Sequence, residues 1–460
     1  MTSPLAAAVQ RLRGRSKAAT GLDGLPSIPV ALGGVLSLCG PGEFRATLLE
    51  RIASAQERIL ITTLYLQDDD SGRQVLAALY AAKAARPQLQ IAVFVDWHRA
   101  QRGLIGKTAS PGNAALYLEM ARRHGAGVPI YGVPVQTREW LGVMHLKGFV
   151  IDDALLYSGA SINDVYLYRA DRYRLDRYHL IESRQVADSM ASLMTRVLQA
   201  NAAVYPVDSE WRPHTRALRS AIIRFRRILA KSSYSVPAGA IGKGGLAITP
   251  LLGFGSRDNQ LNAAIMQLIQ RAQHRLVLFT PYFNLPGVVR RAIDEKIRQR
   301  CRVSILLGDK TANDFYIPPE DPFKTIGALP YLYEANLRRF CTTHQDAVDK
   351  GLLDLHLWRH GRHSFHLKGL LVDDDYALIT GSNLNPRAWR LDLENGLLIH
   401  DPQRSLLSQQ QAELERILAH TRRLSHHSEL DAPDTYPLPV QKILKRLART
   451  RADRLVNQVL

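Results

Sequence analysis

The stretch that decides the fold is His145-Leu-Lys147-Gly-Phe-Val-Ile-Asp152, because the chain contains its pattern twice. The second copy is His366-Leu-Lys368-Gly-Leu-Leu-Val-Asp373. Each copy places Lys two residues after His and Asp five residues after Lys. If both stretches form strands, His and Lys share one face, because strand side chains repeat every two residues. Two full copies in one chain indicate a functional pair rather than two strands with a polar face.

A turn of small residues follows each copy and ends in asparagine. The first turn is Gly159-Ala-Ser161-Ile-Asn163, and the second is Gly381-Ser382-Asn383-Leu-Asn385. We therefore predict a supporting role beside the two histidines for Ser161, Asn163, Ser382 and Asn385.

The segments around the two copies repeat in the same order. Ala55-Gln-Glu-Arg58 and the apolar run to Tyr65 match Ala272-Gln-His-Arg275 and the run to Tyr282. The offset is 217 residues at these alanines, 213 at Asp96 and Asp309, and 221 at the histidines. An offset this constant predicts a duplicated domain with small insertions in loops.

Hydrophobic periodicity predicts strands that alternate with helices in the first half. The strands are expected at residues 58–65, 89–95, 128–133 and 154–158, and the helices at residues 41–57, 71–85 (with Ser71 as the cap) and 113–124. This order predicts an α/β fold with two pseudo-symmetric α/β/α domains, each a mixed sheet flanked by helices. Because one copy supplies one histidine, we predict a single active site shared at the domain interface.

We predict a basic N-terminal arm over residues 1–40, domains over 41–231 and 248–432, a linker over 232–247 and a C-terminal helix over 433–460. The first domain ends in a basic amphipathic helix over residues 212–231, and residues 440–460 form a second one. Each helix either docks by its apolar side or contacts a lipid headgroup surface.

The net charge of +18 over 460 residues favours anionic partners, namely nucleic acid, an acidic membrane surface or phosphorylated substrates. The three cysteines are widely spaced, which predicts neither a metal cluster nor a disulfide framework and fits a reducing cytosol. No signal-peptide core and no run of eighteen apolar residues occurs. A lipid substrate would therefore be reached from outside the bilayer.

The duplicated motif suits chemistry at a phosphodiester. Two lysines neutralise the non-bridging oxygens, one histidine attacks phosphorus, and the other protonates the leaving oxygen and later deprotonates the acceptor hydroxyl. We expect neither a metal nor another cofactor. The predicted catalytic residues are His145, Lys147, Asp152, His366, Lys368 and Asp373, although either Asp could instead fix a turn or hold a lysine.

A nucleophilic imidazole needs an acceptor on its other nitrogen to fix its tautomer. Asp176 and Glu394 follow the two histidines in similar settings, Arg174-Leu-Asp176 and Arg390-Leu-Asp-Leu-Glu394. We predict that these two carboxylates orient the histidines. The alternative is that each is a surface carboxylate paired with a nearby arginine.

The double pattern resembles the phospholipase D superfamily. Longer runs resemble its bacterial CDP-diacylglycerol–serine O-phosphatidyltransferases, the phosphatidylserine synthases of Gram-negative type; these runs are residues 96–103, 158–165, 308–317, 326–333 and 385–395. The resemblance implies a ping-pong reaction in which CDP-diacylglycerol gives its phosphatidyl group to a histidine, CMP leaves, and the L-serine hydroxyl takes the group. By analogy with the superfamily, His145 is favoured as the nucleophile. A cytoplasmic protein at the inner face of the cell membrane is expected.

Polar residues in loops at strand ends are candidate contacts for cytidine diphosphate or serine, because ligands of α/β folds bind there. They are Arg99, Arg102, Lys310 and Asn313, with local pairing as the alternative. Other functions compatible with the motifs are a cardiolipin synthase, a phospholipase that uses water, and a nuclease or nucleic-acid-binding protein, which the charge suits. Two intact motifs disfavour a non-catalytic scaffold.

Overall fold

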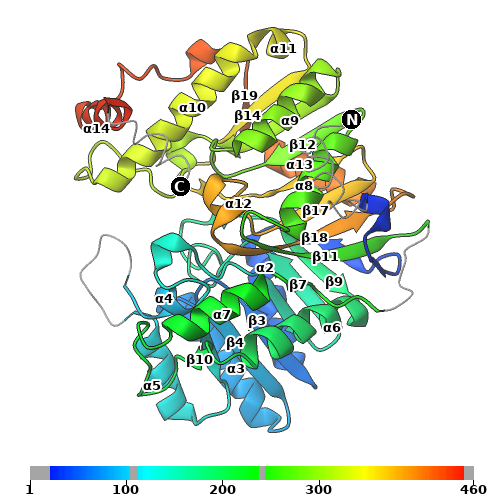
Figure 1. The fold of residues 1–460 in the computed structure, drawn as a ribbon, viewed down its shortest axis with the longest axis vertical. Helices are drawn as coiled ribbons and strands as arrows, with labels where there is room; N and C mark the ends of the chain where they lie inside the picture. The colour runs from blue at the N-terminus through cyan, green and yellow to red at the C-terminus, as the bar shows by residue number, and fades with distance from the viewer. Residues whose placement is uncertain (1–20, 104–111, 238–243, 450–460) are drawn as a thin grey trace, which may run out of the picture.

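The two halves of the chain form two sheets that lie against each other (Figure 1). The fold is seen in a computed structural model that describes residues 21–103, 112–237 and 244–449. The first half fills the lower part of the view in Figure 1 and the second half fills the upper part. The predicted α/β architecture with two related domains is confirmed.

The described part of the first half contains an eight-stranded mixed sheet with the order β10-β5-β4-β3-β6-β7-β9-β2. Strands β3, β4 and β5 pair in parallel, while β6, β7, β9 and β2 add antiparallel pairs. The bounds are β2 Val35–Ser37, β3 Arg58–Thr62, β4 Gln90–Asp96, β5 Ile130–Val133, β6 Gly148–Ile151, β7 Ala154–Ser158, β9 Tyr178–Glu182 and β10 Tyr205–Pro206.

The described part of the second half repeats this sheet with the order β19-β14-β13-β12-β16-β17-β18-β11 and adds β1 beside β11. Each strand has its counterpart at the same place in the first sheet, which confirms the predicted duplication. The bounds are β1 Ile28–Pro29, β11 Ala247–Phe254, β12 Arg275–Phe279, β13 Arg302–Gly308, β14 Leu353–Trp358, β16 Gly369–Val372, β17 Tyr376–Thr380, β18 Leu393–His400 and β19 Thr421–Leu424.

Helices flank both sheets and begin at polar caps where the sequence supplies them. The Asp69 side chain accepts a hydrogen bond from the Gly72 N–H at 3.0 Å, so Asp69 caps α3 and the predicted cap Ser71 is wrong. The bounds of the helices are α2 Pro41–Ser54, α3 Asp70–Ala85, α4 Trp97–Ala100, α5 Ala114–His124, α6 Arg184–Leu193, α7 Arg219–Leu229, α8 Gln260–Arg271, α9 Gly287–Arg298, α10 Leu329–Thr343, α11 Gln345–Asp349, α12 Pro386–Arg390, α13 Leu407–Leu418 and α14 Leu438–Arg449.

Residues 21–40, before α2, join both halves, which corrects the prediction of a basic arm for this part of residues 1–40. Ile28 of β1 pairs with Ile248 in the second sheet, whereas Val35 of β2 pairs with Ile181 in the first. Leu22 is buried in the core of the second half. Residues 1–20 of the predicted arm lie outside the described residues.

The two basic helices dock by their apolar sides. Helix α7 buries Ile222, Phe225 and Leu229, and it is shorter than the predicted helix over residues 212–231. In α14, Val440 is fully buried in a cluster with Tyr331 and Tyr436. The predicted continuation of α14 beyond residue 449 lies outside the described residues. Within the described ranges, we find no helix with the length and apolarity needed to span a bilayer.

Short backbone contacts between the halves position the residues of both motifs. Strand β8 (Arg174–Leu175) of the first half pairs in parallel with β15 (Ser364–Phe365) of the second. A parallel bridge between Met144 of the first half and Leu393 of the second is the equivalent contact under the pseudo-twofold symmetry of the two halves. The histidine motif of each half therefore meets the strand that precedes the carboxylate of the other half.

Candidate active site

Both His-Leu-Lys segments lie immediately before a strand and not within it, which corrects the prediction that they are strands. Strand β6 begins at Gly148 and β16 begins at Gly369. The His145 N–H donates to the Leu393 carbonyl at 2.8 Å, and the His366 N–H donates to the Leu175 carbonyl at 2.8 Å. Each histidine is therefore held by the backbone of the opposite half, directly before Glu394 or Asp176.

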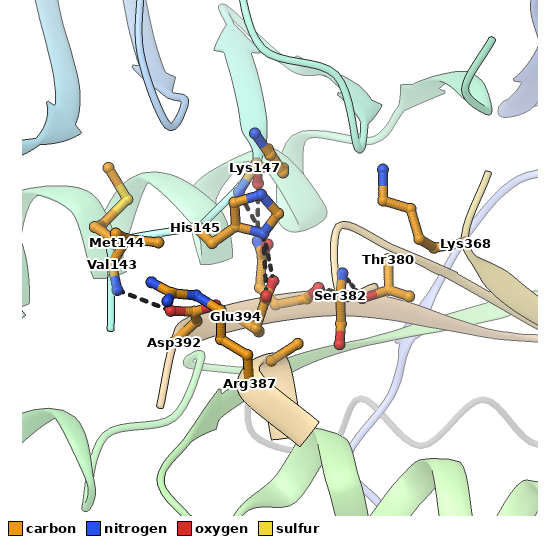
Figure 2. A network of polar contacts seen from close by, with 12 residues as sticks. Val143, Met144, His145, Lys147, Lys368, Thr380, Ser382, Arg387, Asp392 and Glu394 are labelled. Carbon is orange, nitrogen blue, oxygen red and sulfur yellow. Dashed lines mark hydrogen bonds and ion pairs between the residues drawn. The ribbon is translucent and has the colours of Figure 1, made fainter. Parts of the chain in front are cut away.

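His145 is oriented by Glu394 of the second half. Figure 2 shows the imidazole above the carboxylate, with Nδ1 at 2.9 and 3.0 Å from its two oxygens. A carboxylate accepts, so we assign the proton to Nδ1 and a free lone pair to Nε2. Burial and the nearby Lys147 charge lower the pKa of His145 well below its ordinary value, which keeps the ring neutral. Burial raises the pKa of Glu394 well above its ordinary value.

His366 has a different set of partners. The Lys368 ammonium lies 2.6 Å from His366 Nδ1 and 2.6 Å from Asp176 Oδ2, whereas Asp176 itself is 3.5 Å from Nδ1. The Tyr166 hydroxyl lies 3.0 Å from the same nitrogen. An ammonium only donates, so Nδ1 accepts and the proton of the neutral ring is on Nε2. With Glu394 ionised and Lys368 protonated, we therefore assign opposite tautomers to the two histidines.

The difference follows from one methylene group. Asp176 and Glu394 occupy equivalent places after paired backbone contacts, but the shorter Asp176 ends 3.5 Å from the ring, and the Lys368 ammonium lies 2.6 Å from both the Asp176 carboxylate and the ring nitrogen. Burial lowers the pKa of His366 to about 4. Burial raises the pKa of Asp176, but the contacts with Lys368 and His366 together outweigh burial and hold that pKa below its usual range.

The two buried lysines cross over the small-residue turns of the opposite halves. A Cβ atom added at Gly159 would lie 2.5 Å from the Lys368 ammonium nitrogen, and one added at Gly381 would lie 2.8 Å from Lys147 Cγ. Glycine is therefore required at these two positions to let each lysine pass.

Lys147 is fully buried, and its ammonium donates to Ser161 Oγ at 2.8 Å. Burial and the like charge of Lys368 lower the pKa of Lys147 to about 7. The Lys147 backbone is held by Asn395, whose side chain accepts its N–H at 2.9 Å and donates to its carbonyl at 2.8 Å. Two neighbouring cations with weakened proton affinity form a site that an anion would stabilise.

Asp152 and Asp373 are not part of this group, which corrects their assignment as catalytic residues. The Asp152 carboxylate accepts the backbone N–H groups of Gln56, Glu57 and Arg58 at 2.7 to 3.1 Å, at the end of β6 remote from His145. Asp373 makes the equivalent three bonds to residues 273–275. The alternative prediction, that these residues fix a turn, describes them.

The remaining predicted supporting residues shape the turns. Asn385 caps α12 by accepting the Ala388 N–H at 2.9 Å, and Asn163 accepts the Tyr166 N–H at 2.8 Å. Ser382 is buried, and its N–H donates to the Thr380 hydroxyl at 3.1 Å. Ser161 thus contacts a motif lysine, Asn163 and Asn385 bind backbone N–H groups with their side chains, and Ser382 is itself bound through its N–H.

The four candidate substrate contacts pair locally. Arg102 forms an ion pair with Glu139, and Arg99 lies 3.7 Å from the same carboxylate. Lys310 binds Glu334 at 3.0 Å and also binds Asp431, while the Asn313 side chain accepts the Phe315 N–H at 2.9 Å. The structure does not aim these side chains at the histidines, so the local-pairing alternative describes them.

Sequence reasoning missed four residues around His366. Asp314 lies 4.0 Å from its Nε2, and the Tyr282 hydroxyl donates to Asp314 at 3.1 Å. Arg174 contacts Asp314 at 2.7 Å and stacks on the Tyr166 ring at 4.7 Å. Their positions in the sequence were the available signal, because Tyr282 ends a repeated apolar run and Asp314 lies in the run 308–317 that carries the family resemblance. Across the described ranges, no cluster of three His, Cys, Asp or Glu residues is arranged to hold a metal.

Comparisons with known proteins agree with this geometry. Residues 48–197 and 265–418 match the family described as Cardiolipin synthase, PLD-like domain. The chain is 49% identical to CDP-diacylglycerol–serine O-phosphatidyltransferase PssA of Escherichia coli (strain K12), over 97% of this chain and 99% of that protein. The Haemophilus influenzae (Rd) protein of the same description is 46% identical, over 96% and 98% of the two chains.

A solved structure extends the likeness to the whole fold. The crystal structure of phosphatidylserine synthase from Haemophilus influenzae Rd KW20 superposes with a TM-score of 0.92 at 44% identity. The superposition covers 98% of this chain and 100% of that chain. The resemblance predicted from the sequence is therefore confirmed.

Proposed function

This chain belongs to the CDP-diacylglycerol–serine O-phosphatidyltransferase family of phospholipase D-like proteins, and from this premise we propose that it makes phosphatidylserine by a ping-pong reaction. Its substrates are then CDP-diacylglycerol and L-serine, and its second product is CMP. The observation that carries the mechanism is the different partner of each Nδ1, a carboxylate at His145 and an ammonium at His366, from which we assign a free Nε2 lone pair to His145 and an Nε2 proton to His366.

In the first half-reaction, Nε2 of His145 attacks the phosphorus that carries diacylglycerol, and the bond from this phosphorus to the CMP oxygen breaks. His366 gives its Nε2 proton to the departing CMP while its Nδ1 takes a proton from Lys368, 2.6 Å away. The Lys147 and Lys368 side chains stabilise the charge on the non-bridging oxygens. A phosphatidyl group is then bound covalently to His145.

In the second half-reaction, the serine hydroxyl attacks the same phosphorus. The phosphorus–nitrogen bond breaks and its electron pair returns to His145, which is again the neutral Nδ1–H tautomer facing Glu394. The hydroxyl proton passes to Nε2 of His366, and Nδ1 returns a proton to Lys368. The sequence of steps restores every group, as a ping-pong cycle requires.

The test uses the full chain with CDP-diacylglycerol in detergent micelles. We expect phosphatidylserine only with L-serine, and exchange of labelled CMP into CDP-diacylglycerol without serine. Acid-free quenching of His366→Ala should trap a phosphatidyl group that mass spectrometry maps to His145, whereas His145→Ala should trap none. Phosphatidic acid as the only product would make the protein a hydrolase, and a glycerol-type product would make it a different phosphatidyltransferase.

We also propose that the protein acts peripherally at the inner, cytoplasmic face of the cell membrane. The apolar sides of α7 and α14 are docked, while their cationic side chains are exposed; these are Arg219, Arg224, Arg226, Arg227, Lys442, Lys445, Arg446 and Arg449. Attachment is then electrostatic, with each cation near an anionic leaflet contributing about 1 kcal/mol.

Charge reversal tests this attachment without disturbing the docked faces. Lys442→Glu with Lys445→Glu should weaken binding to vesicles of anionic phospholipid and leave activity in micelles unchanged. Binding by the wild type that is independent of salt, or equal for neutral vesicles, would contradict an electrostatic attachment. The same charge predicts non-specific nucleic-acid binding that weakens steeply with salt.

A further inference from the structure

A buried ion pair lies beside His366 and is not used by the proposed phosphoryl-transfer steps. Arg174 Nε lies 2.7 Å from Asp314 Oδ1, and the two side chains are 17% and 10% exposed. The other oxygen of Asp314 accepts the Tyr282 hydroxyl at 3.1 Å and lies 4.0 Å from His366 Nε2. Burying two charges is costly, so a pair placed beside a reacting nitrogen calls for a role in the reaction.

Rigid elements from both halves hold this pair in place. Arg174 lies in β8, which pairs with β15 directly before His366. Asp314 follows β13, and the Asn313 side chain turns the backbone there by accepting the Phe315 N–H at 2.9 Å. The two charges therefore meet at a fixed point on the Nε2 side of His366.

Among the residues that the structure describes, the pair has no symmetric equivalent beside His145. Leu175 and Leu393 make the equivalent backbone contacts in the two halves, so the residue before Leu393, Asp392, is the counterpart of Arg174. Asp392 accepts the Val143 N–H at 2.9 Å and the Arg387 guanidinium at 3.1 Å, so it holds the backbone before His145. The Arg174–Asp314 pair thus marks the side where, in the proposed cycle, CMP leaves and the acceptor enters.

We propose that Asp314 binds the α-ammonium group and Arg174 the α-carboxylate of the L-serine acceptor, while His366 Nε2 receives the hydroxyl proton. This inference rests on the proposed function. Three covalent bonds separate the serine hydroxyl oxygen from its nitrogen, a distance of about 3 Å in the folded rotamer. A hydroxyl bonded to Nε2 therefore brings the ammonium to a carboxylate that is itself 4.0 Å from Nε2.

The charges alternate in such a complex, from Asp314 to the ammonium and from the serine carboxylate to Arg174. Burial raises the pKa of Asp314, but its other contacts, the Arg174 charge foremost, together outweigh burial and lower that pKa below its ordinary value, which keeps the carboxylate ionised. Water and simple alcohols offer neither charge, so binding energy at this pair favours serine over hydrolysis.

The first test compares acceptors on the wild-type protein. 3-Hydroxypropionate lacks the ammonium of serine and ethanolamine lacks its carboxylate, and each should have a kcat/KM about 100-fold below that of L-serine, because a polar site left unpaired discriminates strongly. This comparison needs no variant and depends on no refolding. Equal use of L-serine and 3-hydroxypropionate would overturn the proposal.

The second test separates the two half-reactions. Asp314→Asn should lower kcat/KM for L-serine about 100-fold, mainly through KM, and leave CMP exchange within about threefold of the wild type. Asp309→Asn is the matched control, since Asp309 lies in the same loop and accepts the Thr311 N–H at 2.9 Å. It should leave the serine KM unchanged.

Two results of the second test would overturn the inference. They are an unchanged serine KM in Asp314→Asn, and an equal loss of serine transfer and CMP exchange, which would mean that Asp314 acts on His366 and not on serine. A wild-type protein that neither exchanges CMP nor forms phosphatidylserine would overturn the proposed function itself, and the inference with it.

Discussion

Replacing Glu394 by Gln should inactivate the first half-reaction while leaving the fold intact. The Glu394 carboxylate accepts from His145 Nδ1 with both oxygens at 2.9 and 3.0 Å, and it thereby directs the Nε2 lone pair to the reaction centre. Gln has the same length but carries an NH2 group that donates to Nδ1. The substitution therefore stabilises the tautomer with a proton on Nε2, which cannot attack phosphorus.

The magnitude follows from two changes at this one contact. Losing a buried hydrogen bond to a charged group costs about 1.5–3 kcal/mol, and the new bond stabilises the wrong tautomer by about 0.5–1.5 kcal/mol. Their sum, about 2–4.5 kcal/mol, corresponds to a loss of about 30- to 2,000-fold in rate. Burial already raises the pKa of Glu394, which means that its charge is unfavourable there, so the neutral amide should not lower the free energy of unfolding by more than about 1 kcal/mol.

The assay is exchange of labelled CMP into CDP-diacylglycerol without serine, since this reaction reports only the attack by His145. Thermal unfolding of the same preparations checks that the fold is retained. Glu182→Gln is a control at an exposed glutamate of β9, the strand of the first sheet that is equivalent to β18. Asp176→Asn is an informative contrast, because Asp176 binds Lys368 and does not set the tautomer of a histidine directly.

Exchange by Glu394→Gln within tenfold of the wild type would refute the tautomer argument. A large loss in Glu394→Gln together with full phosphatidyl transfer by His145→Ala would refute the assignment of the nucleophile. Nitrogen chemical shifts of labelled histidine provide an independent reading, because they distinguish the Nδ1–H and Nε2–H forms of His145 directly.

Three further predictions concern packing and pH. Gly159→Ala should abolish activity in the transfer assay, because the added Cβ would lie 2.5 Å from the Lys368 ammonium nitrogen. Gly42→Ala is the matched control, because Gly42 lies on helix α2 with open space around it, and it should stabilise the protein by about 0.5–1 kcal/mol in an unfolding assay. Glu413→Ala should destabilise the protein by about 3–5 kcal/mol in denaturant unfolding, because it leaves the buried guanidinium of Arg177 without its two-point partner at 2.7 and 2.9 Å. Burial lowers the pKa of His366 from 6.5 to about 4, so between these pH values the unfolded chain binds more protons than the folded chain. The free energy of unfolding should therefore rise with pH over this range, by up to about 3 kcal/mol. His366→Gln should reduce this slope, and an unchanged slope would contradict a buried neutral ring.

The sequence predicted the repeated architecture because local patterns determine it. Buried strands such as β3 and β12 read as short β-branched and apolar runs, and two matching copies at a constant offset require two matching sheets. A single active site shared by the two halves was predicted because each copy of the motif contributes only one histidine. The glycines of the two turns were visible as a pattern, but their reason was not, because the lysine that each one accommodates comes from the other half.

Contacts between distant segments could not be predicted in this way. Strands β1 and β2 have only two and three residues and show no periodicity, yet they pair with different sheets. Asp314 and Arg174 are separated by 140 positions and meet only when the loop after β13 packs on β8. Asp152 was grouped with the catalytic residues by its spacing, although a strand of four residues carries it away from His145.

The exchange of carboxylates between the halves explains why duplication could yield a two-step enzyme. Because Glu394 orients His145 and Asp176 anchors the lysine beside His366, neither half holds a complete site, and both histidines must act in one reaction centre. Two identical halves would give both histidines the same tautomer, and the site would then present two lone pairs or two protons at Nε2, not one of each on opposite sides of one phosphorus. The shorter Asp176 removes that identity, since it admits Lys368 to the ring and places the proton of His366 on Nε2. The division of labour that we propose between nucleophile and proton donor therefore follows from a difference of one methylene group at equivalent positions of the two halves.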